Sequence, residues 1–227
     1  MGKKNIILLV GLIVLGLIIV IFFLSPSQQS SDLSDNINAS RDLSSNISFT
    51  GNVSAEIPGD HVLGSYNSEN TIIEYASLTC PHCAIFHGEV FPKIKSELID
   101  KGKVKYIFRD FPIDPLAMAG SMIAHCSGDS KYFGVIDVLL KTQDEWLFDN
   151  ENPYNGLLKV ARLAGLSEEN VKVCLSDNEL FSMIEGNQKL ASSRFGVNGT
   201  PAIFVNNKKI SSLDFDTIMA ELGITED

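Results

Sequence analysis

Apolar and polar residues are unevenly distributed along the chain, and their pattern divides it into three parts. Residues 6–24 hold seventeen apolar residues and two glycines, with no charge. Residues 25–57 hold ten serines and few large apolar residues, too little apolar surface to offset the entropy lost on ordering. From about residue 60, short apolar runs and helical spacing predict a folded domain. The predicted parts are an N-terminal membrane anchor at 1–24, a flexible linker at 25–59 and a domain at 60–223.

The first apolar run is long enough to cross a membrane. Its nineteen residues, as a helix rising about 1.5 Å per residue, would span roughly 28 Å, close to the hydrocarbon thickness of a bilayer. A cleaved signal peptide is the competing interpretation, but the run is longer than such a segment and lacks the small residues of a cleavage site. Lys3 and Lys4 precede the run, and no basic residue follows before Arg41. We therefore predict an uncleaved anchor with a cytoplasmic N-terminus and an exported C-terminal part.

The domain begins with a predicted strand, helix and strand. Residues 71–77 form a β-rich run with one acid, typical of a buried central strand. Residues 83–100 carry apolar residues at helical spacing, and Pro92 should kink this helix. Residues 103–111 alternate apolar and polar positions, as a strand does. This order is the unit of a parallel sheet.

About 80 residues then follow with helical signals and no convincing strand. The predicted helices cover residues 115–126, 131–144, 153–164, 168–174 and 178–195. Because this block is too long for one crossover helix, we interpret it as a helical subdomain inserted at about 112–195. The chain then returns to β structure and closes with one more helix. These last predicted elements are strands at 201–205 and near 209–211, joined by a turn at Asn206-Asn207, and a helix at about 214–222.

Charge and hydropathy exclude two classes of protein. The chain of 227 residues has a formal net charge of −10 and a mean hydropathy of +0.12. Residues 25–227 carry all 28 acids but only 16 of the 18 lysines and arginines, a net charge of −12. The chain therefore lacks the basic stripe of a nucleic-acid-binding protein. It also lacks the second long apolar run of a polytopic membrane protein.

The candidate chemistry lies at Cys80-Pro81-His82-Cys83, between the first predicted strand and the helix after it. A thiolate at a helix N-terminus is stabilised by free backbone N–H groups and by the helix dipole. His82 can add a positive charge or an N–H donor. Cys80 would be this nucleophile, and Cys83, one turn further on, the more buried resolving thiol. Stabilisation of the thiolate makes the disulfide oxidising, so the pair is predicted to donate disulfides.

Two other uses of a C-x-x-C motif are zinc binding and a purely structural disulfide. A zinc site needs two further ligands at suitable spacing, and His125 and Cys126 are not part of a second ligand motif. A disulfide across two residues closes a very small loop and stabilises little. We therefore expect neither a metal nor a cofactor.

Two regions outside the motif point to the same chemistry. Glu74 lies six residues before Cys80, so its carboxylate could lie beneath the cysteines and take the proton from Cys83. The alternative is a surface acid on an edge strand. Thr200 and Pro201 open the returning strand, where proline is tolerated. A cis bond there would form a tight bend facing the cysteines, but the sequence leaves cis and trans open.

Two segments, EYASLTCPHC (74–83) and GVNGTPAIFVN (196–206), resemble the hallmark segments of the DsbA-type thiol–disulfide oxidoreductases. The resemblance covers about residues 60–223. It implies an α/β thioredoxin fold with an inserted helical subdomain, here preceded by an N-terminal transmembrane helix. The catalytic residues it implies are Cys80 as nucleophile, Cys83 as resolving thiol, His82 as thiolate stabiliser and Glu74 as buried acid. The substrate-binding residues it implies are Pro81, Thr200 and Pro201, with Pro201 as the cis-proline.

Two features depart from the family pattern. Thr200 precedes the proline, where the best-known soluble oxidases of this type carry valine and where isomerase and reductase relatives more often carry threonine. The chain also looks tethered, whereas the commonest members are soluble after signal cleavage. Of the remaining cysteines, Cys126 and Cys174 are expected to form a structural disulfide, as some relatives do in an oxidising compartment; two buried free thiols are the alternative. His61, His87 and His125 have no partner evident from the sequence, and we assign them to surface or packing roles.

Together these features predict a monomeric periplasmic enzyme, anchored to the inner membrane, that introduces disulfide bonds into exported proteins. Its substrates would be reduced exported proteins with free thiols, and a membrane oxidase would reoxidise it, as the family resemblance implies. A cleaved signal would instead give a soluble periplasmic protein. Two other functions remain open: a disulfide reductase or isomerase on the same fold, or a non-enzymatic tethered module that binds extended peptides near Pro201.

Overall fold

The computed structural model describes residues 51–148 and 152–224. The predicted anchor at 6–24 therefore lies outside the described residues. Among the residues that are described, no helix is long and apolar enough to cross a membrane.

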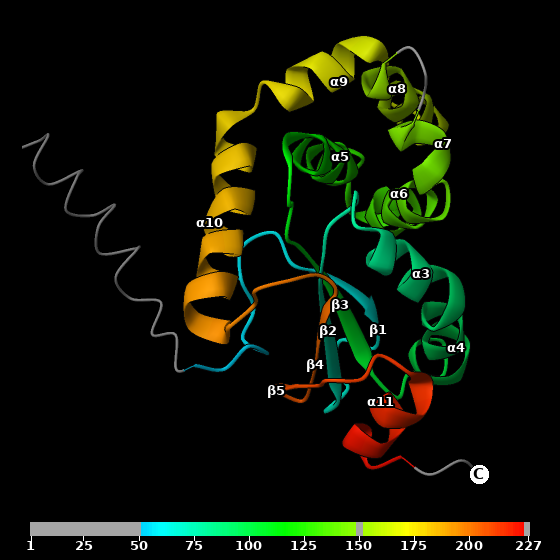
Figure 1. Ribbon diagram of the computed structural model, residues 1–227, viewed down its shortest axis with the longest axis vertical. Helices are drawn as coiled ribbons and strands as arrows, with labels where there is room; N and C mark the ends of the chain where they lie inside the picture. Colours follow the sequence, from blue (N-terminus) through cyan, green and yellow to red (C-terminus); the bar gives the residue numbers. More distant parts are fainter. Residues whose placement is uncertain (1–50, 149–151, 225–227) are drawn as a thin grey trace, which may run out of the picture. The chain divides into compact units, whose positions relative to one another are not determined.

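A five-stranded sheet, built from the described residues, has the order β1-β3-β2-β4-β5 (Figure 1). Its strands are β1 (His61–Gly64), β2 (Thr71–Ala76), β3 (Lys105–Asp110), β4 (Ala202–Val205) and β5 (Lys208–Lys209). Strand β2 is central, pairing in parallel with β3 and antiparallel with β4. The parallel β2–β3 pair confirms the predicted strand–helix–strand unit, whereas β1 was not predicted. Asn206 and Asn207 have positive φ angles of 47° and 73°, as a tight hairpin turn between β4 and β5 requires.

The helix after β2 is interrupted near its middle. It comprises α3 (Pro81–Glu89), α4 (Phe91–Ile94) and the π-helical turn η1 (Lys95–Ile99). The break falls at Val90, two residues before Pro92, whose missing N–H removes one bond from a continuous helix. The kink expected at Pro92 is therefore found as a break between two helices.

Every described element between β3 and β4 is a helix. These are α5 (Pro115–Cys126), α6 (Asp129–Lys141), α7 (Gln143–Leu147), α8 (Pro153–Leu163), α9 (Glu168–Leu175) and α10 (Asn178–Phe195). The helix predicted at 131–144 is divided at Thr142, whose ψ of 24° departs from helical geometry. Local caps explain why the other boundaries could be predicted. Ser167 forms a capping box with Asn170 at the start of α9, and Asp214 caps α11 (Phe215–Leu222).

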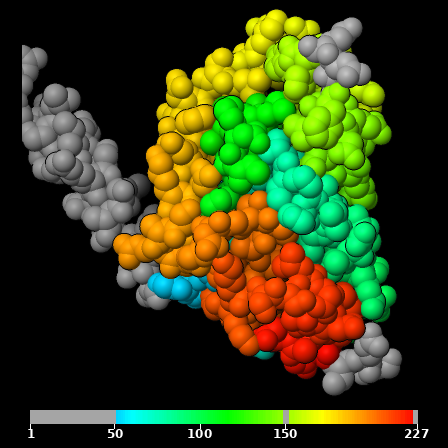
Figure 2. Space-filling view, viewed as in Figure 1, coloured from blue at the N-terminus to red at the C-terminus, as the bar shows by residue number. Residues whose placement is uncertain are grey.

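The two faces of the sheet pack against different helices. Alternate residues of a strand point to opposite faces, so Ile72 and Ala76 share one face of β2 and Ile73 and Tyr75 the other. The first face forms a core with residues of α3, α4, α6 and α11. The second face packs against Ala191 of α10. Helix α11, red in Figure 2, forms the lower part of the surface seen from this side.

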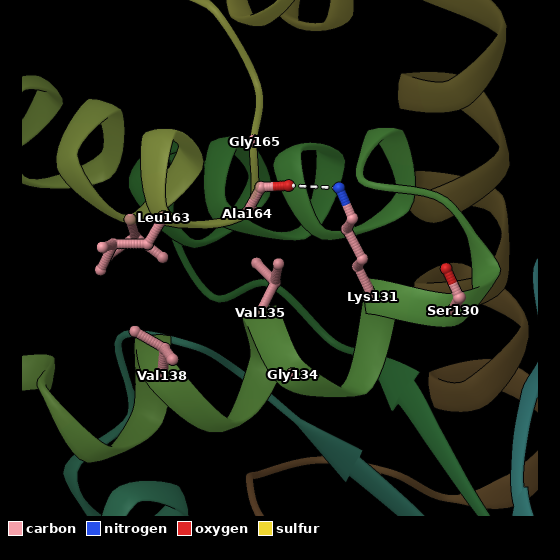
Figure 3. Close-up of a pocket in the computed structure, with 9 residues that line it drawn as sticks. Ser130, Lys131, Gly134, Val135, Val138, Leu163, Ala164 and Gly165 are labelled. Carbon is pink, nitrogen blue, oxygen red and sulfur yellow. Dashed lines mark hydrogen bonds between the residues drawn. The ribbon is translucent and has the colours of Figure 1, made fainter.

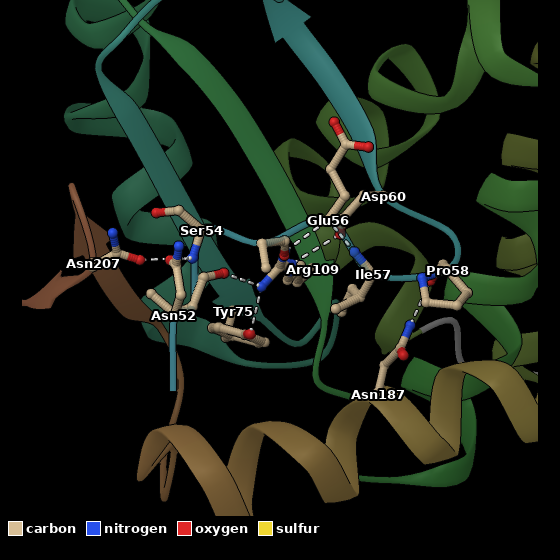
Figure 4. Close-up of polar contacts among 12 residues, drawn as sticks. Asn52, Ser54, Glu56, Ile57, Pro58, Asp60, Tyr75, Arg109, Asn187 and Asn207 are labelled. Atoms are coloured by element: carbon tan, nitrogen blue, oxygen red, sulfur yellow. Dashed lines mark hydrogen bonds and ion pairs between the residues drawn. The ribbon is translucent and has the colours of Figure 1, made fainter. Parts of the chain in front are cut away.

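The packed domain begins before residue 60, contrary to the predicted linker boundary. Val53 and Ile57 are only 2 % and 5 % exposed. The Arg109 guanidinium on β3 donates hydrogen bonds to the carbonyl oxygens of Val53 and Ala55, at 2.7 and 2.8 Å. It also forms a buried ion pair with Asp60, at 2.7 Å (Figure 4). The polar composition of this segment led to a linker boundary that is too late in the chain. The segment is ordered because its backbone binds Arg109, which is far away in the sequence.

The helical insertion contains a cavity of about 480 Å³ between α6 and α8. Val135, Val138 and Leu163 line it, and the Lys131 Nζ donates a 2.8 Å hydrogen bond to the Ala164 carbonyl at its edge (Figure 3). The residues of the Cys80–Cys83 motif do not line this cavity. The candidate chemistry therefore lies elsewhere in the fold.

Candidate active site

The C-x-x-C motif lies at the junction of β2 and α3. Cys80 is the N-cap of α3, with extended backbone (φ −81°, ψ 118°), and Pro81 occupies the first turn. Proline fits there because the first helical N–H groups have no intrahelical partner. Cys80 and Cys83 are both free thiols, 5 % and 0 % exposed. The motif thus places one thiol at the helix N-terminus and the other one turn inside.

The two thiols have opposite acidities. The pKa of Cys80 is lowered to about 5, chiefly because the Cys83 side chain donates a hydrogen bond to it. A side-chain hydrogen bond from Thr200 and the backbone N–H groups of Cys83 and His82 lower it further, against the opposing effect of burial. The pKa of Cys83 is raised by the same contact with Cys80, by burial and by the charge of Glu74. Near neutral pH, Cys80 is therefore a thiolate and Cys83 a thiol.

His82 contributes to this acidity through its backbone N–H group. Its imidazole is exposed and, with Thr200 and Pro201, lines a groove of about 370 Å³ beside α3. The Thr200–Pro201 bond is cis, and the Cys80 Sγ lies 3.3 Å from the Thr200 carbonyl oxygen. The structure thus brings His82, Thr200 and Pro201 to the same side of the motif, next to the Cys80 sulfur.

Glu74 lies on the central strand and is fully buried, which excludes the alternative of a surface acid on an edge strand. Its Oε2 accepts a hydrogen bond from the Tyr106 hydroxyl and lies 2.9 Å from the His87 Nε2. Its Oε1 has no hydrogen-bond partner among the described residues. Its charge helps to raise the pKa of Cys83, after the larger effects of the contact with Cys80 and of burial.

The residues that hold the loop before α3 in place were not predicted from the sequence. The buried Gln143 amide donates hydrogen bonds to the carbonyl oxygens of Leu78 and Cys80, at 2.8 and 3.1 Å. The Thr79 hydroxyl donates to Asp114, the N-cap of α5. These contacts join the loop to the helical insertion across 35 to 65 residues. Local sequence patterns carry no signal for pairs so far apart.

Two of the histidines have buried partners that were not evident from the sequence. His87 pairs with Glu74, and His125 pairs with Asp110 at 2.8 Å. The position of His87 near the cysteines could have been predicted from its spacing in the sequence. It lies four residues after Cys83, so helical geometry places it on the same face of α3.

The other two cysteines lie within the helical insertion. Cys126 and Cys174 are joined by a disulfide between α5 and α9, with their Cα atoms 6.1 Å apart. Met118, Met122 and Ile184 pack around them. In the described part of the chain, no group of three or more His, Cys, Asp or Glu side chains is arranged to hold a metal ion.

Known proteins share this fold. Residues 56–222 match the family model described as thioredoxin. The crystal structure of Wolbachia pipientis alpha-DsbA1 is 29 % identical, with a TM-score of 0.69 over 76 % of this chain and 94 % of that one. The crystal structure of oxidised BdbD from Bacillus subtilis is 25 % identical, with a TM-score of 0.56 over 74 % of this chain and 95 % of that one.

Curated relatives agree with the structural neighbours. Disulfide bond formation protein D of Bacillus subtilis is 28 % identical over 173 residues, which make up 71 % of this chain and 75 % of that protein. A Rickettsia bellii protein, provisionally named a protein-disulfide oxidoreductase, is 34 % identical over 165 residues, 72 % of this chain. This match spans 63 % of the Rickettsia protein, less than two thirds of its length. The chain therefore belongs to the thioredoxin family, in its DsbA-like branch.

Proposed function

We propose that the protein is a thiol–disulfide oxidoreductase that introduces disulfide bonds into exported proteins through Cys80 and Cys83. The observation that carries this proposal is the placement of the two thiols, one at the N-terminus of α3 and one buried a turn later. Their pKa values move in opposite directions. Stabilisation of the Cys80 thiolate stabilises the reduced protein and makes its disulfide a strong oxidant. The names of the relatives support the same chemistry.

The proposed reaction consists of two thiol–disulfide exchanges. A substrate thiolate attacks the Cys80 sulfur of the Cys80–Cys83 disulfide, and the released Cys83 sulfur takes up a proton. A second substrate thiolate then attacks the substrate sulfur of the mixed disulfide, and Cys80 leaves as its stable thiolate. The substrate loses two electrons and gains a disulfide, while the enzyme pair is reduced.

Substrate contacts are proposed on the side of the motif where the groove lies. Pro81, Thr200 and Pro201 would contact the chain being oxidised, and His82 would stabilise the thiolate. Support comes from the groove lined by His82, Thr200 and Pro201, and from the 3.3 Å approach of the Cys80 sulfur to the Thr200 carbonyl oxygen. Glu74 is proposed as the acid that exchanges a proton with Cys83, since its charge acts on that thiol.

The cellular setting is part of the proposal. Residues 6–24 would anchor a monomer to the inner membrane, with the folded domain and its helical insertion at about 112–195 in the periplasm. The uncharged apolar run after Lys3 and Lys4 supports this arrangement. A membrane oxidase would accept two electrons from the reduced pair. Reporter fusions on either side of residues 6–24, with membrane fractionation, test the topology; a soluble, shortened product would favour a cleaved signal.

The function is tested by equilibrating the Cys80–Cys83 pair with glutathione buffers and by oxidising a reduced, unfolded test protein. We expect an oxidising equilibrium, substrate oxidation by the wild type and none by Cys80→Ala. A strongly reducing equilibrium with a normal Cys80 pKa would favour the reductase or isomerase. If the protein bound unfolded peptides but exchanged no disulfides with them, the peptide-binding module would be favoured.

A further inference from the structure

A buried carboxylate–imidazole pair joins the strand that leads into the cysteine motif to the helix that follows it. Glu74 and His87 are 0 % and 2 % exposed, and the Glu74 Oε2 lies 2.9 Å from the His87 Nε2. The Tyr106 hydroxyl donates to the same oxygen. Glu74 comes from the centre of the sheet and His87 from the helix that also carries Cys83. The pair therefore connects the two elements that meet at the motif.

Each partner has one buried polar atom left over. The Glu74 Oε1 and the His87 Nδ1 have no hydrogen-bond partner within the described residues. A buried polar atom without a partner is costly, and such atoms in native structures call for an explanation. Both are atoms that can accept a proton, one at each end of the pair.

His87 also borders a cavity of about 350 Å³ lined by residues of α4, η1 and α6 and by Leu63 of β1. Phe91, Phe133 and Ile136 form its apolar wall. The His87 ring stacks on Phe91 with centroids 4.6 Å apart, so the imidazole is held in one orientation. The carboxylate whose charge acts on the Cys83 thiol is thus connected, through one side chain, to a space wide enough for water.

The charges around this path are balanced. The ionisable groups that meet the His87 ring are Glu74 from β2 and, through that carboxylate, Tyr106 from β3. Two ion pairs stand at the cavity: Lys95 with Asp100 at 2.7 Å, and Asp137 with Lys141 at 2.9 Å. They leave no net charge at the cavity mouth that would fix the charge of the imidazole.

We propose that His87 is a positioning residue that holds the Glu74 carboxyl and carries its proton to and from the cavity. When Cys83 leaves as a thiolate, a water in the cavity protonates the His87 Nδ1, the proton on the His87 Nε2 passes to Glu74, and Glu74 gives its proton to Cys83. When the pair is reoxidised, the Cys83 proton passes to Glu74, then to His87, and leaves to water. Sulfur–sulfur bonds exchange as in the proposed function, on which this inference rests, and no further oxidant is needed.

The experiment measures one step, closure of the Cys80–Cys83 disulfide, without a substrate protein or a redox partner. Reduced protein is mixed with oxidised glutathione, and the rate at which Cys83 displaces glutathione from Cys80 is measured by acid quenching and mass spectrometry across pH. We expect His87→Ala to close its disulfide about 100-fold more slowly near neutral pH than the wild type. Its rate should rise about tenfold per pH unit, because bulk hydroxide must then remove the Cys83 proton. Added imidazole should restore the rate in proportion to its concentration.

Two variants separate proton transfer from packing. His87→Gln keeps an N–H donor for Glu74 but cannot carry a proton, so it should be folded and stay slow. His125→Ala removes the other histidine paired with a buried carboxylate, at 2.8 Å, and should keep the wild-type rate with no response to imidazole. A wild-type pH profile in His87→Gln, or equal imidazole acceleration of His125→Ala, would overturn the inference. Failure of the wild-type pair to close would instead overturn the proposed function.

Discussion

The Cys80 sulfur lies 3.3 Å from the carbonyl oxygen of Thr200, a residue 120 positions later in the chain. The two meet because β4 runs antiparallel to β2, with Ala202 opposite Tyr75, so the start of β4 lies beside the end of β2. The Thr200 carbonyl can accept a hydrogen bond from the Cys80 thiol, whereas the Thr200 side chain stabilises the thiolate. Thr200 is thus placed to influence the acidity of Cys80.

Substitution of Thr200 should weaken that acidity. Thr200→Val removes the hydroxyl and keeps the shape, so the pKa of Cys80 should rise above about 5. The rise should be smaller than in Cys83→Ala, because the Cys83 hydrogen bond is the largest cause of the shift. Ultraviolet absorbance of the thiolate across pH measures both, with Cys80→Ala as the blank. A larger effect of Thr200→Val than of Cys83→Ala would contradict this order.

The stability of the reduced protein should depend on pH through Cys80. Its folded pKa of about 5 lies below the ordinary value of 9.0, so between these values the unfolded chain binds more protons. The contribution of Cys80 should therefore be complete above the ordinary value and be lost as the pH falls through about 5. Denaturant unfolding of reduced wild type and Cys80→Ala across pH measures it. Parallel stability curves for the two proteins would show that no such linkage exists.

The ion pair of Arg109 with Asp60 should be important for stability. Both side chains are buried, and removing one partner leaves an unpaired charge, so Asp60→Asn should cost about 3–5 kcal/mol. It should also make residues 51–60 more susceptible to limited proteolysis. The matched control is Lys189→Met, which removes an exposed pair with Glu185 and should cost less than about 1 kcal/mol. Equal losses of unfolding free energy in the two variants would contradict the prediction.

Gln143 should be needed to keep the active-site loop ordered. Gln143→Leu keeps a side chain of similar size but leaves the Leu78 and Cys80 carbonyl oxygens without this donor. We expect a loss of about 1–3 kcal/mol and faster hydrogen exchange in the loop before α3. Gln188 is the control, because it makes a similar bond to the Pro112 carbonyl outside the motif. If Gln188→Leu accelerated exchange in that loop as much, the specific role of Gln143 would be refuted.

Replacing two different glycines by alanine should change the free energy of unfolding in opposite directions. A Cβ at Gly156 of α8 would lie 2.6 Å from the Trp146 Cβ and 2.7 Å from its carbonyl oxygen, so Gly156→Ala should cost about 1–3 kcal/mol. A Cβ at Gly186, within α10, meets nothing within 4 Å. Gly186→Ala should stabilise the helix by about 0.5–1 kcal/mol. Thermal unfolding of both variants checks the pair, and a stabilised Gly156→Ala would contradict the packing of α7 on α8.

The sequence predicted the elements whose signals are local. The helix boundaries could be placed because their caps, such as Ser167 and Asp214, lie within a few residues of the helices they begin. The cysteine motif could be placed for the same reason. Strand β1 was missed because its four residues carry no alternation, and it is recognised only through its pairing with β3.

What could not be predicted depends on partners far apart in the chain. Arg109 lies 54 residues from the Ala55 carbonyl it binds, and composition alone made that segment look like a linker. Gln143 lies 63 residues from the Cys80 carbonyl. Such contacts form only when the sheet and the insertion are assembled. The residues that hold the site in place are therefore visible in the structure and not in the sequence.

The edge of the sheet at β5 has a consequence for a protein proposed to meet unfolded chains. Strand β5 consists of Lys208 and Lys209 alone, and both are exposed. A very short edge strand with lysines discourages another chain from adding to the sheet. An incoming unfolded polypeptide would therefore find no ladder to extend at β5, and the protein could handle aggregation-prone chains without being drawn into their aggregates.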